Sequence, residues 1–569
     1  MKRLIDWLDD RLGVRALLGV ALEEDVPGGA RLQYVFGSVL VFLFMQQVLL
    51  GILLAFYYSP SATDAWASTA YLNDQVTAGW FLRGLHHHGS SAMVVVMVLH
   101  LLQVAWAGAY RKPREINWWT GLLMAFVVLG FALTGYLLPW DQKGYWATQV
   151  ATGIMGTVPG GEPLQQLAQG GSQYGNLTIT RFYAIHVFVL PLALGGLLAV
   201  HMIAFRKHGV TPPAHLSDEE LARKNQPFWP NQLFIDVVAM MVMAVVLVGL
   251  TVYTHGAELY APADPASNFV ARPEWYFLFL FQLLKYFEGP LSIIATVIIP
   301  GAVVTGLMAL PFVDRKGSRR PRARIKALAF IGLIMAGIAA LTALAIVEDA
   351  GNEAYQKGLV TAEEQAEKAR KLALEGVPPA GGVAVFENDP EFKARQLFTD
   401  HCAGCHTLDG HGGDNAPSFD DYGDRDWLFA LLRNPRDKRF FGGTKHDGME
   451  PLAADAVSDA QLRAVVEYVH SLQGEGTADA ALVAEGKKLW EEEVVECGTC
   501  HEVKAGAESV GPTLAGRGTK EWIERIIRDS SQPDLYGDSA EMPQFKDKLR
   551  DDEIATLAAL IVGRAAGDS

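Results

Sequence analysis

Residues 80–107 read WFLRGLHHHGSSAMVVVMVLHLLQVAWA, an apolar stretch long enough to cross a bilayer as one helix. Backbone polar groups in lipid must be satisfied within the segment, which favours a helix. The stretch contains His86 and His100, which are 14 residues apart. Fourteen helical steps return to within about 40° of the same face and rise roughly 21 Å. Because ionisable residues inside a span are costly and usually functional, the stretch predicts a membrane helix with a histidine ligand near each end.

Residues 181–206 form a second apolar stretch with the same feature. This stretch contains His186 and His201, which lie 15 residues apart, within about 60° of one helix face and separated by roughly 22 Å. Two such helices can clamp two haems, with His86 facing His186 and His100 facing His201. By periodicity alone, His87 or His88 can replace His86 as the ligand.

Glycines repeat at the same interval in two neighbouring apolar stretches. Gly37 and Gly51 are 14 residues apart, and so are Gly121 and Gly135. Glycine lets another group approach the backbone closely, which suits flat macrocycles pressed against the helices. Ordinary close packing of helices also uses glycine, and the spacing alone favours neither interpretation.

Seven apolar stretches of about 20 residues or more are expected to cross the membrane as helices. They lie near 33–57, 80–107, 117–138, 181–206, 233–254, 291–313 and 326–347. Lysine and arginine gather in the loops after the second, fourth and sixth stretches, which indicates that these loops and the N-terminus are cytoplasmic. Because seven is odd, the C-terminal tail is expected on the opposite side of the membrane.

The tail holds all four cysteines of this 569-residue chain, in Cys402-Ala-Gly-Cys405-His406 and Cys497-Gly-Thr-Cys500-His501. Motifs of the form CxxCH attach c-type haem, and here they leave no cysteine for a disulfide, zinc or an iron–sulfur cluster. The tail therefore predicts two covalent haems with His406 and His501 as iron ligands.

Each half of the tail has one methionine after its CxxCH motif, Met449 in the first and Met542 in the second. Methionine often supplies the sixth iron ligand in c-type haem proteins. We expect Met449 and Met542 to be these ligands, with His446 as the alternative in the first half. The net charge of -15 comes from the acidic tail, which would repel nucleic acid.

Residues 1 to about 347 resemble the cytochrome b family of quinol–cytochrome c and plastoquinol–plastocyanin oxidoreductases, and residues 389–566 resemble class I cytochrome c twice. The motifs that carry the first resemblance are Arg83-Gly-Leu-His86, Lys112-Pro-Arg-Glu115, Gly135-Tyr-Leu-Leu-Pro-Trp-Asp-Gln142 and Thr180-Arg-Phe-Tyr-Ala-Ile-His186. The family spacing selects His86 over its two neighbours. The resemblance implies an all-α fold, with a seven-transmembrane-helix bundle followed by two small helical cytochrome c domains.

We expect six segments along the chain. They are an interfacial amphipathic helix (1–32), a four-helix di-haem core (33–209), a three-helix region with a quinol-site loop (210–347), a polar linker (348–388) and two cytochrome c domains (389–474 and 478–566).

The resemblance also implies site residues and cofactors. Pro273-Glu274-Trp275-Tyr276 matches the family signature at the outer quinol-oxidation site, with Glu274 as the proton acceptor. Arg83 is expected at the outer haem, and Arg206 and Asp236 at the inner quinone site. The chloroplast-type protein attaches an extra haem to a cysteine where this chain has Val35, so no thioether-linked haem is expected there. The expected cofactors are two haem b, two haem c and quinone as substrate.

These features predict the core subunit of a respiratory quinol–cytochrome c oxidoreductase that translocates protons in a bacterial inner membrane, with its c haems on the periplasmic side. The expected partners are a separate Rieske iron–sulfur protein, a terminal oxidase or soluble cytochrome as acceptor, and a second copy of the complex. The alternatives are a passive haem anchor that wires another dehydrogenase to quinone and a haem-based redox sensor.

Overall fold

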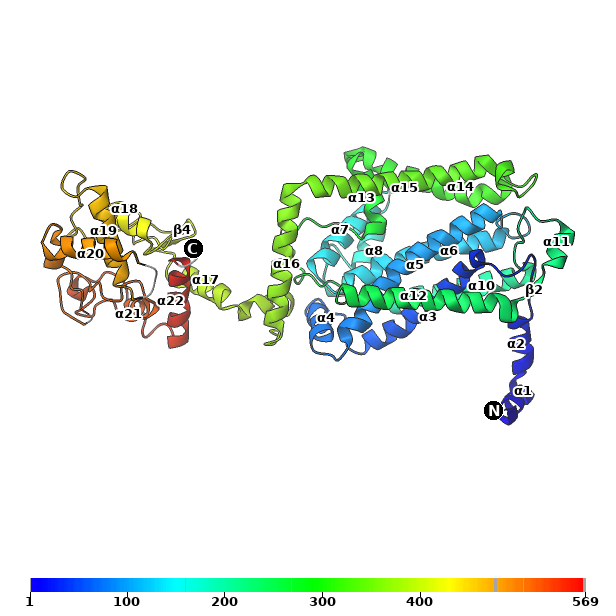
Figure 1. Ribbon diagram of the computed structural model, residues 1–569, viewed down its shortest axis with the longest axis horizontal. Helices are drawn as coiled ribbons and strands as arrows, with labels where there is room; N and C mark the ends of the chain where they lie inside the picture. Colours follow the sequence, from blue (N-terminus) through cyan, green and yellow to red (C-terminus); the bar gives the residue numbers. More distant parts are fainter. Residues whose placement is uncertain (1, 159, 268, 475–477, 505, 566–569) are drawn as a thin grey trace. The chain divides into compact units, whose positions relative to one another are not determined.

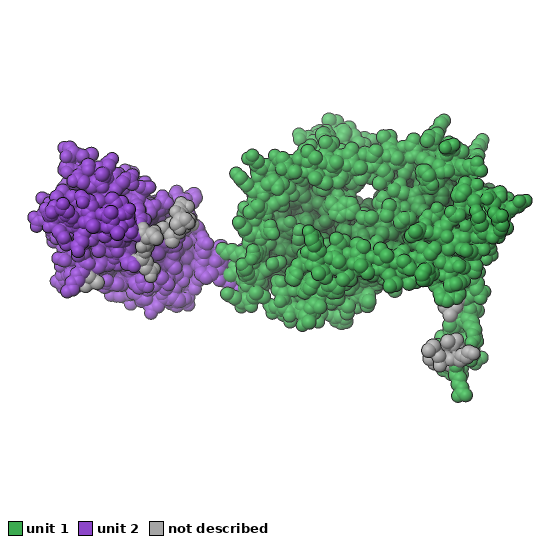
Figure 2. All heavy atoms as spheres, viewed as in Figure 1, with its two compact units in different colours: residues 1–385 green, residues 386–569 purple. Residues whose placement is uncertain are grey.

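The computed structural model describes residues 2–158, 160–267, 269–474, 478–504 and 506–565. Met1 and Ala566, outer bounds of two predicted segments, lie outside the described residues. The chain divides into two compact units, Met1–Val385 and Phe386–Ser569, each of which is described by itself (Figure 2).

The first unit contains seven helices in its described residues that are long and apolar enough to cross a membrane, which confirms the predicted seven-span all-α fold (Figure 1). Their principal helical segments are α3 (Val35–Ala55), α5 (Gly79–Ala107), α6 (Glu115–Leu137), α9 (Asn176–Ala184) continued by α10 (Leu190–His208), α12 (Leu233–Tyr253), α14 (Ile299–Val313) and α15 (Ile325–Gly351).

The core of the bundle places the two histidine-bearing spans where their side chains can meet. Helix α3 packs against α5, α6 packs against α10, and α12 packs against both α3 and α5. The residues buried between them are apolar, among them Val39, Leu43, Val94 and Val128. The histidines therefore lie within a largely apolar bundle interior.

Three segments with π-helical hydrogen bonding, each associated with a proline, occur in these spans. The segments η2 (Ile185–Val189) and η6 (Ile294–Ile298) end shortly before Pro191 and Pro300, whereas η3 (Phe228–Gln232) contains Pro230 and a kink at Trp229. Proline lacks the backbone N–H that an α-helix needs, and wider π turns are frequent at functional sites. The turn at η2 contains His186, so the irregular backbone lies at one of the predicted ligands.

Shorter elements cover the ends of the bundle. They are α1 (Lys2–Leu12), α2 (Val14–Leu22), α4 (Ala65–Asp74), α7 (Gln142–Gly156), α8 (Glu162–Gln169), α11 (Asp218–Arg223), α13 (Leu278–Lys285), α16 (Glu353–Ala373), the 3-10 turns η1 (Leu32–Tyr34), η4 (Trp275–Phe277), η5 (Gly289–Leu291), η7 (Pro321–Arg324) and η8 (Gly382–Asn388), and the antiparallel pair β1 (Asp25–Val26) and β2 (Gln226–Pro227).

The segment 348–388, which its composition marks as a linker, is largely helical. Helix α16 begins after Asn352, whose side chain caps its first turn, and it packs against α4. Ala362, Ala366 and Ala369 are buried along one stripe of α16. These small side chains let the polar helix lie close to its neighbour.

The second unit consists of two halves with the same order of elements. The helices are α17 (Pro390–His401), α18 (Arg425–Arg433) and α19 (Asp459–Ser471) in the first half, then α20 (Ala480–Glu491), α21 (Lys520–Arg528) and α22 (Asp551–Ala565) in the second, with the turns η9 (Glu496–Thr499) and η10 (Gly537–Ser539) and the antiparallel pair β3 (Thr407–Leu408) and β4 (His411–Gly412). One continuous apolar core runs through both halves. The family's small helical domains therefore share a single interior.

Candidate functional site

One of the two intramembrane histidine pairs, His86 and His186, has its rings facing each other, as the sequence spacing predicts. The imidazole rings of His86 on α5 and His186 in η2 have centroids 6.3 Å apart. Bonds from a metal to imidazole nitrogen are about 2 Å long, so an iron held by both rings separates their centroids by about 6 Å. His100 and His201 line one inner cavity together. The geometry thus fits an iron between His86 and His186 and brings the second pair into one cavity.

The structure separates His86 from its two neighbours. The Nε2 atom of His88 lies 2.8 Å from Thr254 Oγ1 and 3.1 Å from Gly256 O, which engages this ring with the loop after α12. His87 also lines the outer cavity. In the part of the chain that the structure describes, His86 is the histidine of the three whose ring contacts that of His186, as the family spacing implies.

Each of the four repeated glycines lies against one of the four histidines. A Cβ atom built on Gly37 would lie 3.7 Å from Cε1 of His100, and one on Gly51 would lie 3.5 Å from Cε1 of His86. The matching distances are 3.6 Å from Gly121 to His201 and 2.6 Å from Gly135 to His186. At Gly37, Gly51 and Gly121 the only neighbour within 4 Å is the histidine. These glycines therefore clear space beside the rings, and do not serve close helix packing.

Two threonines that the sequence analysis missed orient the histidines of the fourth span. Thr134 Oγ1 lies 3.0 Å from His186 Nδ1, and Thr120 Oγ1 lies 3.0 Å from His201 Nδ1. Each hydroxyl donates its own hydrogen to a helix carbonyl, so it accepts the Nδ1–H of the ring. The Nε2 lone pair is then free to bind a metal. The repeated Thr-Gly dipeptide, 14 residues apart, was the available signal.

Replacing Thr134 by valine is expected to raise the midpoint potential of a haem held by His86 and His186 by tens of millivolts, up to about 60 mV, which corresponds to a tenfold change in a one-electron equilibrium. The hydrogen bond makes imidazole a stronger electron donor and favours ferric iron, so its loss favours ferrous iron. A redox titration of the b-type absorbance would measure this shift. Thr120→Val is the matched control, and equal shifts of both haems in either variant would contradict the assignment.

The outer cavity, about 210 Å³, brings the signature loop to the same space as His86 and His186. Glu274 lines it, with a side chain only 14% exposed, and accepts a hydrogen bond of 3.3 Å from Lys143 Nζ. Tyr276 is buried and also lines the cavity, whereas Trp275 is 46% exposed. Of the four predicted residues of this motif, Glu274 and Tyr276 are therefore placed to meet a substrate.

Lys143, like the two threonines, is a residue that the sequence analysis did not assign to the site. Its ammonium lies between Glu274 and Glu258 and over the rings of Tyr136 and Tyr260. Burial lowers the pKa of Lys143, but the two carboxylates outweigh burial and raise the pKa above its ordinary value. The pocket thus contains a permanent positive charge beside Glu274.

The loops around the outer cavity are held by two arginines. Arg272, next to Pro273, donates to Asp349 at 2.8 and 2.9 Å and stacks on Phe281 and Tyr355. Arg83 lines the cavity and donates to the carbonyl oxygens of Ala257 and Glu258 at 2.9 and 2.7 Å. Bidentate arginine pairs hold geometry well, so these contacts keep Glu274 in place.

The inner cavity, about 420 Å³, is lined by His100, His201, Ser38 and Arg114. Neither Arg206 nor Asp236, the residues expected at an inner quinone site, is among the residues that line it. Arg206 pairs with Glu24. Asp236 is buried and accepts hydrogen bonds from Gln232 at 2.8 Å and from Ser38 at 2.7 Å. Asp236 therefore reaches the cavity only through Ser38.

The two CxxCH motifs fold into the same turn. The backbone N–H of His406 donates to Cys402 O, and that of His501 donates to Cys497 O, both at 2.9 Å. His406 Nδ1 lies 2.7 Å from Pro417 O, and His501 Nδ1 lies 2.8 Å from Pro512 O. Burial lowers the pKa of both imidazoles, which favours the neutral ring whose Nε2 lone pair can bind iron.

Comparison with known proteins now decides the family. Residues 91–262 match the family model described as "Cytochrome b(N-terminal)/b6/petB", and residues 262–361 match "Cytochrome b(C-terminal)/b6/petD". The cytochrome b6 of Auxenochlorella protothecoides is 39% identical over 214 residues, which make up 37% of this chain and 100% of that protein. The chain belongs to the cytochrome b family.

This cytochrome b carries cytochrome c sequences in its tail. Residues 393–473 match the family model "Cytochrome c", and residues 481–561 match "Cytochrome C oxidase, cbb3-type, subunit III". Among solved structures, a chain of "Hyperthermophilic respiratory Complex III" is 27% identical, with a TM-score of 0.55 over 65% of this chain and 97% of that chain. The protein is therefore a multi-pass membrane cytochrome with haem b and haem c domains.

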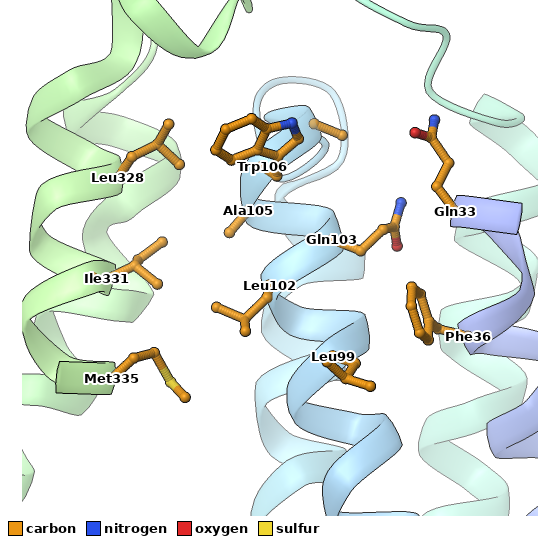
Figure 3. A pocket seen from close by; sticks show the side chains of 12 residues that line it. Gln33, Phe36, Leu99, Leu102, Gln103, Ala105, Trp106, Leu328, Ile331 and Met335 are labelled. Carbon is orange, nitrogen blue, oxygen red and sulfur yellow. The ribbon is translucent and has the colours of Figure 1, made fainter. Parts of the chain in front are cut away.

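The residues present in this cytochrome b fit both kinds of haem. Facing histidines with glycine beside each ring suit haem b, which is not covalently attached. The paired cysteines and the carbonyl-bonded histidines of the tail suit haem c. A third cavity, about 570 Å³, lies between α5 and α15, where Leu328, Ile331 and Met335 face Leu102 and Trp106 (Figure 3). Its described lining contains no titratable side chain, so it lacks histidine or thiolate ligands for haem.

Proposed function

We propose that this cytochrome b is the core subunit of a respiratory quinol–cytochrome c oxidoreductase and that quinol is oxidised in the outer cavity. The observation that carries the proposal is that Glu274 and the histidine pair His86 and His186 line one cavity. A proton acceptor and an electron acceptor for the same substrate would then lie within reach of it. The likeness to a respiratory Complex III chain supports the same reaction class.

Oxidation of a quinol removes two protons and two electrons. The carboxylate of Glu274 accepts one hydroxyl proton, and the neighbouring ammonium of Lys143 stabilises the ionised carboxylate before transfer. Tyr136 and Tyr276 line the pocket and exclude water around the ring. When bound, the haems would carry the two electrons one at a time along two routes. One electron would pass to the two haem b groups, and the other would pass through a Rieske centre to the two haem c groups. Pro273 and Trp275 position the loop that carries Glu274.

The remaining assignments belong to the same proposal. Quinone is reduced at the inner cavity, near Arg206 and near Asp236, which reaches this cavity through Ser38. All four cysteines lie in CxxCH motifs, so the Rieske centre, which needs two cysteines, belongs to a separate subunit. The electrons leave to a terminal oxidase or soluble cytochrome, and the complex is a homodimer. The N-terminus faces the cytoplasm of a bacterium and the haem c tail faces the periplasm.

The test is quinol-driven reduction of the b haems in the purified complex with its Rieske partner. With an inner-site inhibitor present, the b haems are expected to become reduced at the same time as the c haems. If the b haems stay oxidised while the c haems are reduced, divided electron transfer is wrong. If neither is reduced by quinol but a bound dehydrogenase reduces both, the protein is a passive anchor.

Replacing Lys143 by methionine is expected to slow quinol oxidation by roughly tenfold, which corresponds to about 1.4 kcal/mol in the barrier. The ammonium of Lys143 donates to the Glu274 carboxylate at 3.3 Å, so its loss removes the charge-assisted hydrogen bond that holds the proton acceptor in the cavity. Steady-state quinol oxidation measures the rate. Lys285→Met, which removes a lysine paired with exposed Glu348, is the control, and an equal loss of rate in both variants would exclude a local effect.

A further inference from the structure

The two halves of the tail exchange their terminal helices. Helix α17, which leads into the first CxxCH motif, packs against α22 at the end of the second half (Figure 1). Helix α20, which leads into the second motif, packs against α19 at the end of the first half. Among the described residues 390–474, 478–504 and 506–565, no comparable packing joins α17 to α19 or α20 to α22.

Side-chain contacts at both crossings show that the packing is close. Lys393 on α17 lies 3.6 Å from the carboxylate of Asp552 on α22. At the other crossing, a Cβ atom built on Gly486 of α20 would lie 2.0 Å from Ala464 O of α19. Only glycine permits this approach of two backbones. Each CxxCH motif is therefore bounded by the last helix of the other half.

The loops next to the motifs follow the same exchange. The ring of His401, which directly precedes Cys402, has its centroid 6.3 Å from that of Phe545, three residues after Met542. In the opposite direction, Gly516 N in the loop after Pro512 donates to Leu472 O at the end of α19 at 2.9 Å. The first motif thus meets the methionine loop of the second half, and the second motif meets the helix that follows Met449.

The two methionine loops pass beside each other between these sites. Lys445 N donates to Glu541 Oε1 at 3.2 Å, and the rings of His446 and Tyr536 have centroids 5.2 Å apart. These contacts place Met449 and Met542 in neighbouring loops of one structure. Because the two loops are adjacent, each methionine could belong to the haem site of the other half without a rearrangement of the chain.

We propose that the tail is a crossed dihaem unit, in which Met542 and α22 close the site of His406, and Met449 and α19 close the site of His501. Neither half can complete its own site, so the two sites form together. In this arrangement the two haem sites share one apolar core, and the last helix of the chain, α22, forms part of the site at the first motif. His446 contacts Tyr536 and is not required as a ligand.

The helix exchange is tested in the full-length haem-loaded protein. The variant Lys393→Cys with Asp552→Cys carries a protease site inserted between Gly474 and Ala478, and a short bis-maleimide bridges the new thiols. After cleavage, denaturing electrophoresis with haem staining is expected to show the two tail fragments joined. In the control, Lys393→Cys with Asp459→Cys, the fragments are expected to separate. Separate fragments in the first variant, with an intact bridge between residues 393 and 459 in the control, would overturn the proposal.

The ligand exchange is tested by spectroscopy of variants with one covalent haem. With Cys497→Ala and Cys500→Ala, the remaining haem at His406 is expected to lose its methionine-to-iron charge-transfer band on Met542→Ala and to keep it on Met449→Ala. The reverse pattern would disprove the crossed ligands. If the single-haem protein does not fold, the same band is followed in the dihaem protein in which His406→Ala is combined with each methionine variant. Loss of the remaining band on Met449→Ala, but not on Met542→Ala, is then the expected result, and the opposite loss contradicts it.

Discussion

Replacing Glu274 by glutamine is expected to slow quinol oxidation by about 10²–10⁴-fold, the usual contribution of a positioned general base. Glutamine keeps the size and the hydrogen-bonding oxygen of the side chain but cannot accept a proton. The side chain is enclosed beside Lys143, so water has little access to replace it. The rate constant for quinol-driven reduction of the b haems, measured by stopped flow, reports the effect.

Two controls make this result specific. The absorbance of the b haems should be unchanged, because Glu274 is not a ligand. Glu348→Gln, which alters a carboxylate paired with Lys285 away from the cavity, should leave the rate within a factor of two. A rate within threefold of the unaltered protein for Glu274→Gln would show that another group accepts the proton.

Replacing His86 by alanine is expected to remove the haem proposed between His86 and His186, since a haem needs both its axial ligands. With the two b haems of the proposed function, about half of the b-type absorbance is then lost. The ring of His86 is the one that faces His186, with Gly51 beside it. Quinol-driven electron transfer to the remaining inner haem should stop, because the outer acceptor is gone. Difference spectroscopy after haem extraction gives the haem content.

His88→Ala is the matched control on the same helix. His88 bonds to Thr254 and Gly256, so its loss should loosen the loop after α12 and retain both haems. If His88→Ala removes a haem and His86→Ala does not, the assignment of His86 is wrong and His88 is the ligand. Loss of both b haems in both variants would indicate a folding defect, whereas a retained inner haem would show that the bundle is folded.

Much of the membrane core follows from local patterns in the sequence. Hydrophobic length predicted seven spans, because a bilayer requires about 20 apolar residues per helix. The 14- and 15-residue spacings predicted which histidines share a face, because the helical repeat is nearly constant. The same repeat explains why Gly51 and Gly135 lie beside histidine rings. These inferences need only the geometry of a single helix.

Contacts between distant segments could not be predicted in this way. Lys143 meets Glu274 only because the loops after α6 and α12 fold over the same cavity. Asp236 does not line the inner cavity directly and is connected to it through the hydrogen bond from Ser38, a contact that its motif did not predict. A charged residue in a motif indicates chemistry, but its partner depends on how the loops pack.

The sequence by itself determined the seven spans, the four membrane histidines and the two CxxCH motifs, because helix periodicity and motif spacing are local properties. Only the tertiary structure decided which terminal helix closes each half of the tail. Helices α19 and α22 both present apolar faces of similar length, so either could pack against α17 by composition. The choice depends on side-chain fit, such as Gly486 against Ala464, which exists only once the helices are brought together.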